Sequence, residues 1–172
     1  MALQVILNIL TQAELSVVRE LASRATWIDC HNTARRSTVK HNEQVDVRSS
    51  EGHAVAQIVV DALARRIPEP VALTTPMLNR YRVGMEYGSH IDAEVMDGVR
   101  PDVAMTLFLS DPADYGGGEL LIAGSPPVKL AAGEAIVYAC DRVHAVTPVT
   151  RGERLAVVCW IQNSPRIGIR PP

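Results

Sequence analysis

The sequence predicts a mainly β protein with flanking helices, built as a double-sheet jelly roll with the helices packed on one face. Two amphipathic segments lie in the first third of the chain, and about eight short apolar segments follow Pro76 with turn residues between them. This order is typical of a sandwich or barrel that carries its helices on one side. There is no repeat, low-complexity segment or linker, so we expect a single domain over residues 1–172. Residues 1–75 would support a jelly-roll core at residues 76–163.

Length and composition set the first limits on function. The 172 residues are enough for one buried core, and 47% hydrophobic with 21% charged residues is ordinary for a globular protein. The net charge of −2, without a block of like charges, predicts neither nucleic acid nor a membrane surface as a partner. No apolar run reaches the ~18 residues of a membrane span. Residues 1–9 lack the basic lead and cleavage site of a signal peptide.

The three cysteines, Cys30, Cys140 and Cys159, are far apart in the sequence and form no CxxC pair. This pattern argues against a disulfide framework and against a structural zinc site. We expect buried free thiols at Cys140 and Cys159, because both lie in apolar strand-like segments. The same pattern favours a reducing, cytoplasmic location.

The first elements follow from local signals. Residues 3–10 are apolar and predict a strand. Thr11 and Glu14 form a capping box, in which the hydroxyl and the carboxylate satisfy the first free amides of a helix. Apolar residues at helical spacing then predict an amphipathic helix over residues 12–24. The next strand begins at Trp27-Ile28, with the Trp27 ring as its anchor.

Residues 31–50 are polar and irregular, and two interpretations stay open. They form either a solvated loop with an edge strand, or a segment that folds over the mouth of a site and contacts a substrate. Alternating valines predict a strand over residues 39–47. The charged and amide side chains of the segment include Arg35, Arg36, Lys40, His41, Asn42 and Gln44.

A second helix is predicted next, with Ser50 as its N-cap and with Pro68 and Pro70 ending it. An apolar stripe at helical spacing consists of Val55, Ile58, Val59, Ala62 and Leu63. Both helices therefore have an apolar face that we expect to pack on the outside of a sheet.

Short strands and turns follow Pro76. The first strand spans residues 77–83 and places Asn79, Tyr81 and Val83 on one face. Turn signals lie at residues 110–112, 116–118 and 124–127. Further strands are expected at residues 87–91, 103–109, 119–122, 128–130, 134–140, 144–149 and 154–161.

His90, Asp92 and His144 are candidate metal ligands. His90 and Asp92 are two residues apart, so a strand or its end points both side chains the same way. His144 lies 52 residues beyond Asp92 on another predicted strand. Two imidazoles and one carboxylate can bind a ferrous ion on one face and leave the opposite positions open. The alternative is a pair of core histidines, because a single His-x-Asp spacing is common by chance.

Arg154 begins an apolar strand and shares its even-numbered face with Ala156, Val158 and Trp160. A guanidinium on a buried face needs an anion as partner. That anion is either an internal Asp or Glu, or the far carboxylate of a diacid bound beside the metal. Tyr81 is either a core tyrosine with a polar tip or a second donor to the same carboxylate.

From about Pro76 to Pro165 the chain resembles the PKHD-type hydroxylases, bacterial relatives of the catalytic domain of prolyl and lysyl hydroxylases. The motifs cover roughly half of the chain and are specific when taken together. They are Asn79-Arg80-Tyr81, His90-Ile91-Asp92, Thr106-Leu107-Phe108-Leu109-Ser110-Asp111-Pro112, Gly117-Gly118-Glu119-Leu120, the segment from His144 to Gly152, Arg154 and Trp160-Ile161-Gln162.

The resemblance implies a double-stranded β-helix of the cupin-like jelly-roll type, with Fe(II) bound by His90, Asp92 and His144. It also implies 2-oxoglutarate as cosubstrate and O2 as oxidant, with ascorbate as an additional cofactor to be tested. Such an enzyme hydroxylates an unactivated C–H bond and releases succinate and CO2. We expect a small-molecule or amino-acid-like substrate. The carboxylate of Asp92 favours hydroxylation, because related halogenases lack it.

The same resemblance assigns 2-oxoglutarate to Arg154, and it places Phe108, Leu120 and Trp160 in the lining of the cosubstrate pocket. Family members usually continue into a C-terminal helical extension, and the segment between Asp92 and the next strand is short here. Both regions lie near the substrate mouth of this fold, so the substrate is left open. Arg142, just before His144, either reaches a substrate anion or is a solvated loop arginine.

Three rival functions stay open from the sequence alone. A jelly-roll module could bind or sense a metal or a 2-oxo acid without turnover. A desaturase would use the same site with a different outcome. A cupin-type dioxygenase would use iron without 2-oxoglutarate, although Arg154 argues against it.

Overall fold

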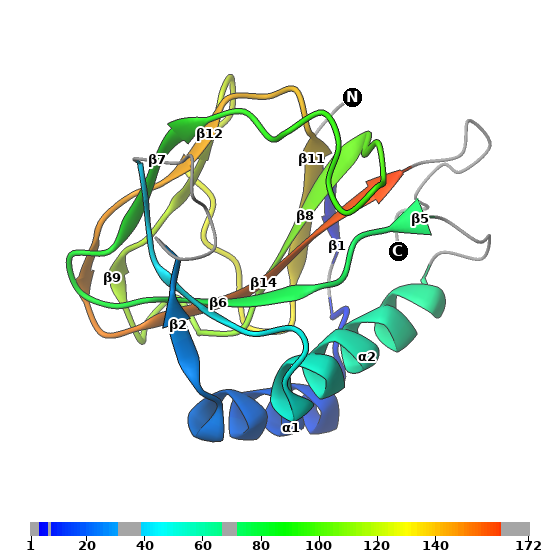
Figure 1. The fold of residues 1–172 in the computed structure, drawn as a ribbon. Helices are drawn as coiled ribbons and strands as arrows, with labels where there is room; N and C mark the ends of the chain where they lie inside the picture. Colours follow the sequence, from blue (N-terminus) through cyan, green and yellow to red (C-terminus); the bar gives the residue numbers. More distant parts are fainter. Residues whose placement is uncertain (1–3, 7, 31–38, 67–71, 163–172) are drawn as a thin grey trace.

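The structure, a computed structural model, describes residues 4–6, 8–30, 39–66 and 72–162 (Figure 1). A large antiparallel sheet has the strand order β1-β11-β8-β14-β6-β4-β2, with β5 paired to β14. A smaller sheet has the order β10-β12-β7-β3, and β13 pairs with β9. Two helices pack on one side of the large sheet, so the predicted jelly roll with helices on one face is confirmed.

Helix α1 (Gln12–Arg24) begins where the capping box predicted. The Glu14 amide donates to the Thr11 hydroxyl at 3.2 Å, and the Thr11 amide donates to the Glu14 carboxylate at 2.8 Å. Helix α2 (Ser50–Ala64) begins one residue earlier than expected, because its N-cap is Ser49. The Gly52 amide donates to the Ser49 hydroxyl, whereas the Ser50 hydroxyl donates to the neighbouring Glu51 carboxylate. Pro68 and Pro70 lie outside the described residues.

The N-terminal third contributes strands to both sheets: β1 (Gln4–Ile6), β2 (Trp27–Asp29), β3 (Lys40–His41) and β4 (Glu43–Val45). The single strand predicted over residues 39–47 is wrong. Strand β3 pairs with β7 in the small sheet, whereas β4 pairs with β2 and β6 in the large one. The chain changes sheets at the buried Asn42, and an alternating valine pattern carries no information about which sheet a strand joins.

The remaining strands are β5 (Ala72–Leu73), β6 (Met77–Tyr81), β7 (Glu86–His90), β8 (Val103–Phe108), β9 (Gly116–Gly117), β10 (Leu120–Ile122), β11 (Ala135–Ala139), β12 (His144–Val146), β13 (Val149–Arg151) and β14 (Arg154–Gln162). The strand predicted at residues 128–130 reduces to one bridge between Val128 and Leu120. The strand predicted at 144–149 is divided into β12 and β13, which pair with different strands.

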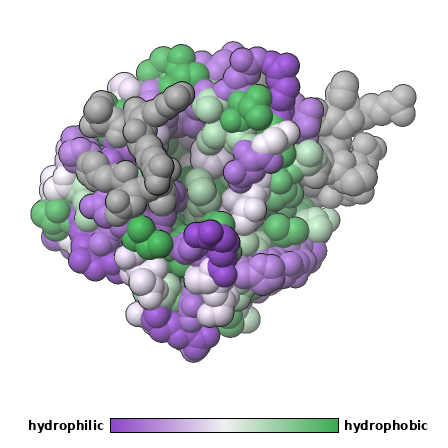
Figure 2. Space-filling view, in the orientation of Figure 1, coloured by the Kyte–Doolittle hydropathy of each residue, from purple (hydrophilic) through white to green (hydrophobic). Residues whose placement is uncertain are grey.

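Strand β14 separates two hydrophobic clusters. Its odd-numbered residues, such as Val157 and Cys159, pack with the helices, whereas Trp160 packs in the cluster between the sheets. This alternation is the one predicted for Arg154 and Trp160. Val83 departs from prediction, because β6 ends at Tyr81 and leaves Val83 63% exposed. Hydrophobic and hydrophilic side chains are interspersed on the face shown in Figure 2.

All three cysteines are buried and outside any disulfide, as predicted for Cys140 and Cys159. Burial raises the pKa of the Cys159 thiol to about 12, so it stays protonated at neutral pH. Within the described residues, neither helix combines the length and the apolar character that a membrane span requires.

Candidate metal centre

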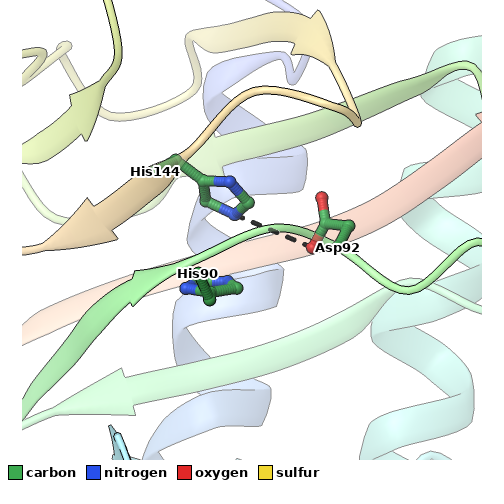
Figure 3. Close-up of side chains that lie close together, drawn as sticks. All are labelled: His90, Asp92 and His144. Atoms are coloured by element: carbon green, nitrogen blue, oxygen red, sulfur yellow. Dashed lines mark ion pairs between the residues drawn. The ribbon is translucent and has the colours of Figure 1, made fainter.

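The small sheet brings the three candidate ligands together. His90 ends β7 and His144 begins β12, and the antiparallel register places these two residues opposite each other. Asp92 follows β7 by two residues. Ligand atoms of the three side chains all lie within 4.8 Å of one another, and Figure 3 shows the three side chains close together. Pairing of distant strands therefore closes the 52-residue gap in sequence between Asp92 and His144.

Each histidine is oriented by a backbone carbonyl two residues earlier in the chain. The Nδ1 atom of His90 is 2.8 Å from the Gly88 carbonyl oxygen, and Nδ1 of His144 is 3.0 Å from the Arg142 carbonyl oxygen. A carbonyl only accepts, so both Nδ1 atoms carry the proton and both Nε2 atoms keep a lone pair. This tautomer is the one that binds a metal through Nε2.

Burial and charge also suit a cation at this position. The Asp92 carboxylate places Oδ1 3.7 Å from Nε2 of His144, and its Oδ2 is buried without a hydrogen-bond partner. Burial lowers the pKa of His90, which favours the neutral, ligating form of its ring. A divalent cation would give the buried carboxylate oxygen the partner that it lacks.

Aromatic rings hold both imidazoles in place. The Tyr87 ring stacks on His90 with centroids 3.6 Å apart, and the Tyr138 ring meets His144 edge-on at 5.1 Å. Tyr87 and His90 share a face because the β7–β12 register shifts between its two paired positions. A regular strand would put them on opposite faces, so sequence alternation did not identify Tyr87 as a site residue.

Arg154 is the largest fully buried side chain, with 2% exposure. Its Nε and Nη2 atoms have no hydrogen-bond partner, and no described carboxylate lies within salt-bridge distance. The internal ion pair considered from the sequence is therefore absent from the described part of the chain. The Tyr81 and Phe108 rings lie 5.1 and 5.2 Å from its Cζ atom. An unpaired buried charge costs several kcal/mol, which a bound anion would offset.

One cavity of about 780 Å³ contains His90, Asp92, His144 and Arg154 in its lining. Tyr81, Leu120 and Trp160 line it too. Phe108 is not among the lining residues; it is fully buried in the cluster between the sheets, beside the Arg154 guanidinium. Trp160 brings a buried indole N–H that has no hydrogen-bond partner.

The cavity also has Lys40, from the segment for which a substrate contact stayed open, and residues to which the sequence assigned no site role, among them Asn79, Thr106 and Tyr138. Asn79 accepts from the side chains of Asn42 and Gln44, at 3.1 and 2.7 Å. These two amides are buried, so the solvated loop is wrong for them. The sequence signal that could have found this network is Asn79 itself, a polar residue on the same strand face as Tyr81.

Arg142 is directed away from the cavity. Its guanidinium donates to the Ala123 carbonyl oxygen at 2.9 Å, and Arg142 is not among the lining residues. Of the two interpretations left open for this side chain, a contact with a substrate anion therefore finds no support in the geometry.

Known proteins share both the motifs and the fold. The sequence profile of the 2OG-Fe(II) oxygenase superfamily matches residues 76–162. A PKHD-type hydroxylase of Paracoccus denitrificans is 38% identical over 175 residues, covering 92% of this chain and 77% of the relative. The similarity to PKHD-type hydroxylases predicted from the motifs is thereby confirmed.

Two solved structures show the same fold. The viral collagen prolyl hydroxylase of Paramecium bursaria Chlorella virus 1, in its 2-oxoglutarate complex, aligns with a TM-score of 0.66 at 20% identity, over 94% of this chain and 96% of that one. A prolyl hydroxylase of Trichoplax adhaerens, bound to a peptide fragment of hypoxia inducible factor, aligns with a TM-score of 0.64 at 19% identity, over 93% and 83%. With the profile match over half of the chain and the close relative, the chain belongs to the 2OG-Fe(II) oxygenase superfamily and is a 2-oxoglutarate-dependent dioxygenase that uses Fe(II), 2-oxoglutarate and O2.

Proposed function

We propose that this dioxygenase hydroxylates an unactivated C–H bond of a small-molecule or amino-acid-like substrate, with Fe(II) bound by His90, Asp92 and His144. We further propose that Arg154 binds the far carboxylate of 2-oxoglutarate. One observation carries the proposal: a buried, unpaired guanidinium shares a cavity with three clustered ligand atoms. This pairing suits a chelating diacid that lies between the metal and the arginine.

The protein's part in metal binding is to present three ligands without rearrangement. Both imidazoles are held in the ligating tautomer by backbone carbonyls, and Tyr87 and Tyr138 restrict rotation of the rings. The two imidazole nitrogens and the carboxylate oxygen would hold the metal and leave positions open for the cosubstrate and O2. When bound, Fe(II), 2-oxoglutarate and O2 would supply the oxidation: one oxygen atom of O2 enters succinate as 2-oxoglutarate loses CO2, and the other enters the substrate C–H bond as a hydroxyl group.

The end of the cavity proposed for the cosubstrate suits an anion that is kept away from water. Arg154 offers two unpaired N–H groups, and the Tyr81 ring lies against its guanidinium. Leu120 and Trp160 line the same space and exclude water from the pair. Phe108 supports the guanidinium from behind, so its proposed role is to position Arg154 and not to touch the cosubstrate. A dry site strengthens the guanidinium–carboxylate interaction.

Hydroxylation is favoured over the rival outcomes. Asp92 is one of the three clustered ligand residues, and its carboxylate would take the metal position that a halogenase leaves to a halide. A sensing module would need the same metal and diacid sites but no substrate space. The cavity of about 780 Å³ leaves room beyond 2-oxoglutarate. The two solved relatives are named as prolyl hydroxylases, one acting in collagen and one bound to a peptide, which supports an amino-acid-like substrate.

Two finer expectations accompany this function. Three buried cysteines outside any disulfide support the cytoplasmic location expected from the cysteine pattern. Ascorbate as an additional cofactor stays a prediction, and adding it to the turnover assay tests it directly.

A substrate screen monitored by succinate release tests the proposal. Small carboxylic acids, amino acids and prolyl peptides are added to protein with Fe(II), 2-oxoglutarate and O2. We expect one class to stimulate succinate formation, and His90→Ala or Asp92→Ala to reduce it to background while circular dichroism shows an intact fold. His53→Ala is the matched control, because His53 is exposed on α2. Full turnover in either ligand variant would overturn the metal assignment.

A further inference from the structure

Lys40 places a cation in the cavity at a point that the proposed iron and 2-oxoglutarate sites do not use. It lies on β3, which pairs with β7 so that Lys40 is opposite Tyr87. Its Nζ atom is 5.5 Å from the centroid of the Tyr87 ring, and that ring stacks on His90 at 3.6 Å. The distance from the Lys40 ammonium to the centroid of the His90 ring is therefore at most the sum of these two distances, which places the ammonium near the proposed metal site.

The fit between the two strands holds Lys40 at this place. The Gly88 amide donates to the Val39 carbonyl oxygen at 2.8 Å. A Cβ atom at Gly88 would lie 2.9 Å from the Val39 Cβ, so the absence of a side chain lets β3 approach β7. Lys40 is half-buried beside the tyrosine ring, and burial lowers the pKa of its ammonium. Because the ammonium has lost part of its hydration, a bound anion would stabilise it more than an anion would on an open surface.

No carboxylate in the described residues lies within salt-bridge distance of the Lys40 ammonium. Outside the described residues the sequence contains one acidic side chain, Glu69. The eight residues before Val39 hold Arg35 and Arg36 and no acid. Among the described residues of the lining, Asp92 is the one acid, and it belongs to the proposed metal site.

The charges of the groups in the cavity indicate which charge the substrate carries. Iron brings two positive charges and Arg154 brings one, whereas Asp92 brings one negative charge and 2-oxoglutarate brings two. The proposed iron and cosubstrate sites are therefore neutral together. The charge of Lys40 is left over, and a single positive charge matches a monoanion.

We propose that Lys40 binds an anionic group of the substrate. This group is a carboxylate, and it lies close to the substrate C–H bond that faces the metal. This inference rests on the proposed function, because the charge balance assumes iron and 2-oxoglutarate in their sites. The carboxylate pairs with the ammonium while Tyr87 offers its ring to the adjoining apolar part of the substrate. Lys40 thereby selects acids over amides of the same shape.

Benzoate and benzamide test this directly, because they share a shape and differ in charge. The full-length protein is loaded with Zn(II), which is redox-inert, and with saturating 2-oxoglutarate so that Arg154 is occupied. Saturation-transfer difference NMR then measures binding of each probe at millimolar concentration. We expect benzoate to bind, benzamide to bind about tenfold more weakly, and Lys40→Met to lose the preference. Lys40→Arg should retain it, because the charge is kept.

Lys129→Met is the matched control. Lys129 also lies over a tyrosine ring, at 3.9 Å from Tyr115, but it does not line the cavity. The variant should bind benzoate like the wild type. Equal binding of the two probes, an unchanged preference in Lys40→Met, or no benzoate signal would overturn the proposal. A stronger signal from phenyl phosphate than from benzoate would overturn the carboxylate assignment. The visible band of anaerobic Fe(II) and 2-oxoglutarate in the wild type reports separately on the proposed function.

Discussion

At the scale of single residues, the site contains both side chains held by hydrogen bonds and buried polar atoms that have no hydrogen-bond partner. The Asp92 Oδ2 atom and two nitrogens of Arg154 are buried and unsatisfied. Such groups lower the stability of the ligand-free protein and are stabilised when a cation and an anion arrive. Metal and cosubstrate binding should therefore raise the unfolding free energy of this protein.

His90 makes the stability of the metal-free protein depend on pH. Burial lowers its pKa below the ordinary histidine value of about 6.5, so below that pH the unfolded chain binds a proton that the folded protein does not. The unfolding free energy should therefore fall as pH drops below 6.5, until the folded pKa is reached. Chemical denaturation of metal-free protein between about pH 7.5 and 5.5 measures this slope.

The His90→Ala variant should show a shallower pH slope than the wild type, whatever its absolute stability. His53→Ala should keep the wild-type slope, because His53 is exposed on α2. Identical slopes in wild type and His90→Ala would contradict the assignment.

Gly118 controls the position of Arg154 from the turn before β10. A Cβ atom there would lie 3.0 Å from the Tyr115 ring and 3.1 Å from the Arg154 Cδ atom. Gly118→Ala should therefore displace the guanidinium and weaken 2-oxoglutarate binding about tenfold, or about 1.4 kcal/mol. Calorimetric titration of 2-oxoglutarate into the Zn(II)-loaded protein measures the change.

Gly124→Ala separates that contact from backbone strain. Both glycines have positive φ, at 66° for Gly118 and 78° for Gly124, but a Cβ atom at Gly124 meets only Arg142 Nη1, at 3.7 Å. Gly124→Ala should be destabilised and bind 2-oxoglutarate normally. Equal affinity losses in the two variants would show that strain, and not contact with Arg154, is responsible.

At the scale of elements, β14 joins the helical side of the protein to the site. Its odd-numbered side chains pack against the helices, and Arg154, Val158 and Trp160 line the cavity. The helices therefore stabilise the sheet from the side opposite the site (Figure 1). Stability and cosubstrate binding should respond separately to changes in α1.

Removal of the α1 capping box tests that separation. Thr11→Ala deletes the hydroxyl that accepts from the Glu14 amide and should lower the unfolding free energy by about 1 kcal/mol. Ser16→Ala in the middle of the same helix should change it by at most a few tenths of that, because Ser16 is exposed and alanine suits a helix. Urea denaturation measures both variants. A loss of 2-oxoglutarate affinity in Thr11→Ala would contradict the separation.

At the scale of the whole molecule, the sequence predicted what depends on local spacing. The capping box, the faces of β14 and the grouping of His90 with Asp92 all follow from periods of 3.6 or 2 residues. The jelly roll followed from the order of the elements. These features are encoded by neighbours in the chain, so no knowledge of distant contacts was needed.

The rest depends on contacts between distant segments. The change of sheets at Asn42, the register shift that stacks Tyr87 on His90, and the closeness of Lys40 to the cavity all arise from strand pairing. Phe108 illustrates the same limit, because the resemblance placed it in the lining of the cosubstrate pocket, whereas its ring lies 5.2 Å from the Arg154 Cζ atom and outside the cavity lining. The division of the chain at residues 75 and 76, and the roles of the individual site residues, stay predictions.

The central claim is that iron and 2-oxoglutarate bind together in one cavity through His90, Asp92, His144 and Arg154. Anaerobic addition of Fe(II) and 2-oxoglutarate to the wild-type protein should produce a weak metal-to-ligand charge-transfer band in the visible spectrum. Arg154→Met should require at least about tenfold more 2-oxoglutarate to produce the same band, because the buried ion pair is lost. A wild-type protein that binds both components without the band, or an Arg154→Met protein with unchanged 2-oxoglutarate dependence, would contradict the account.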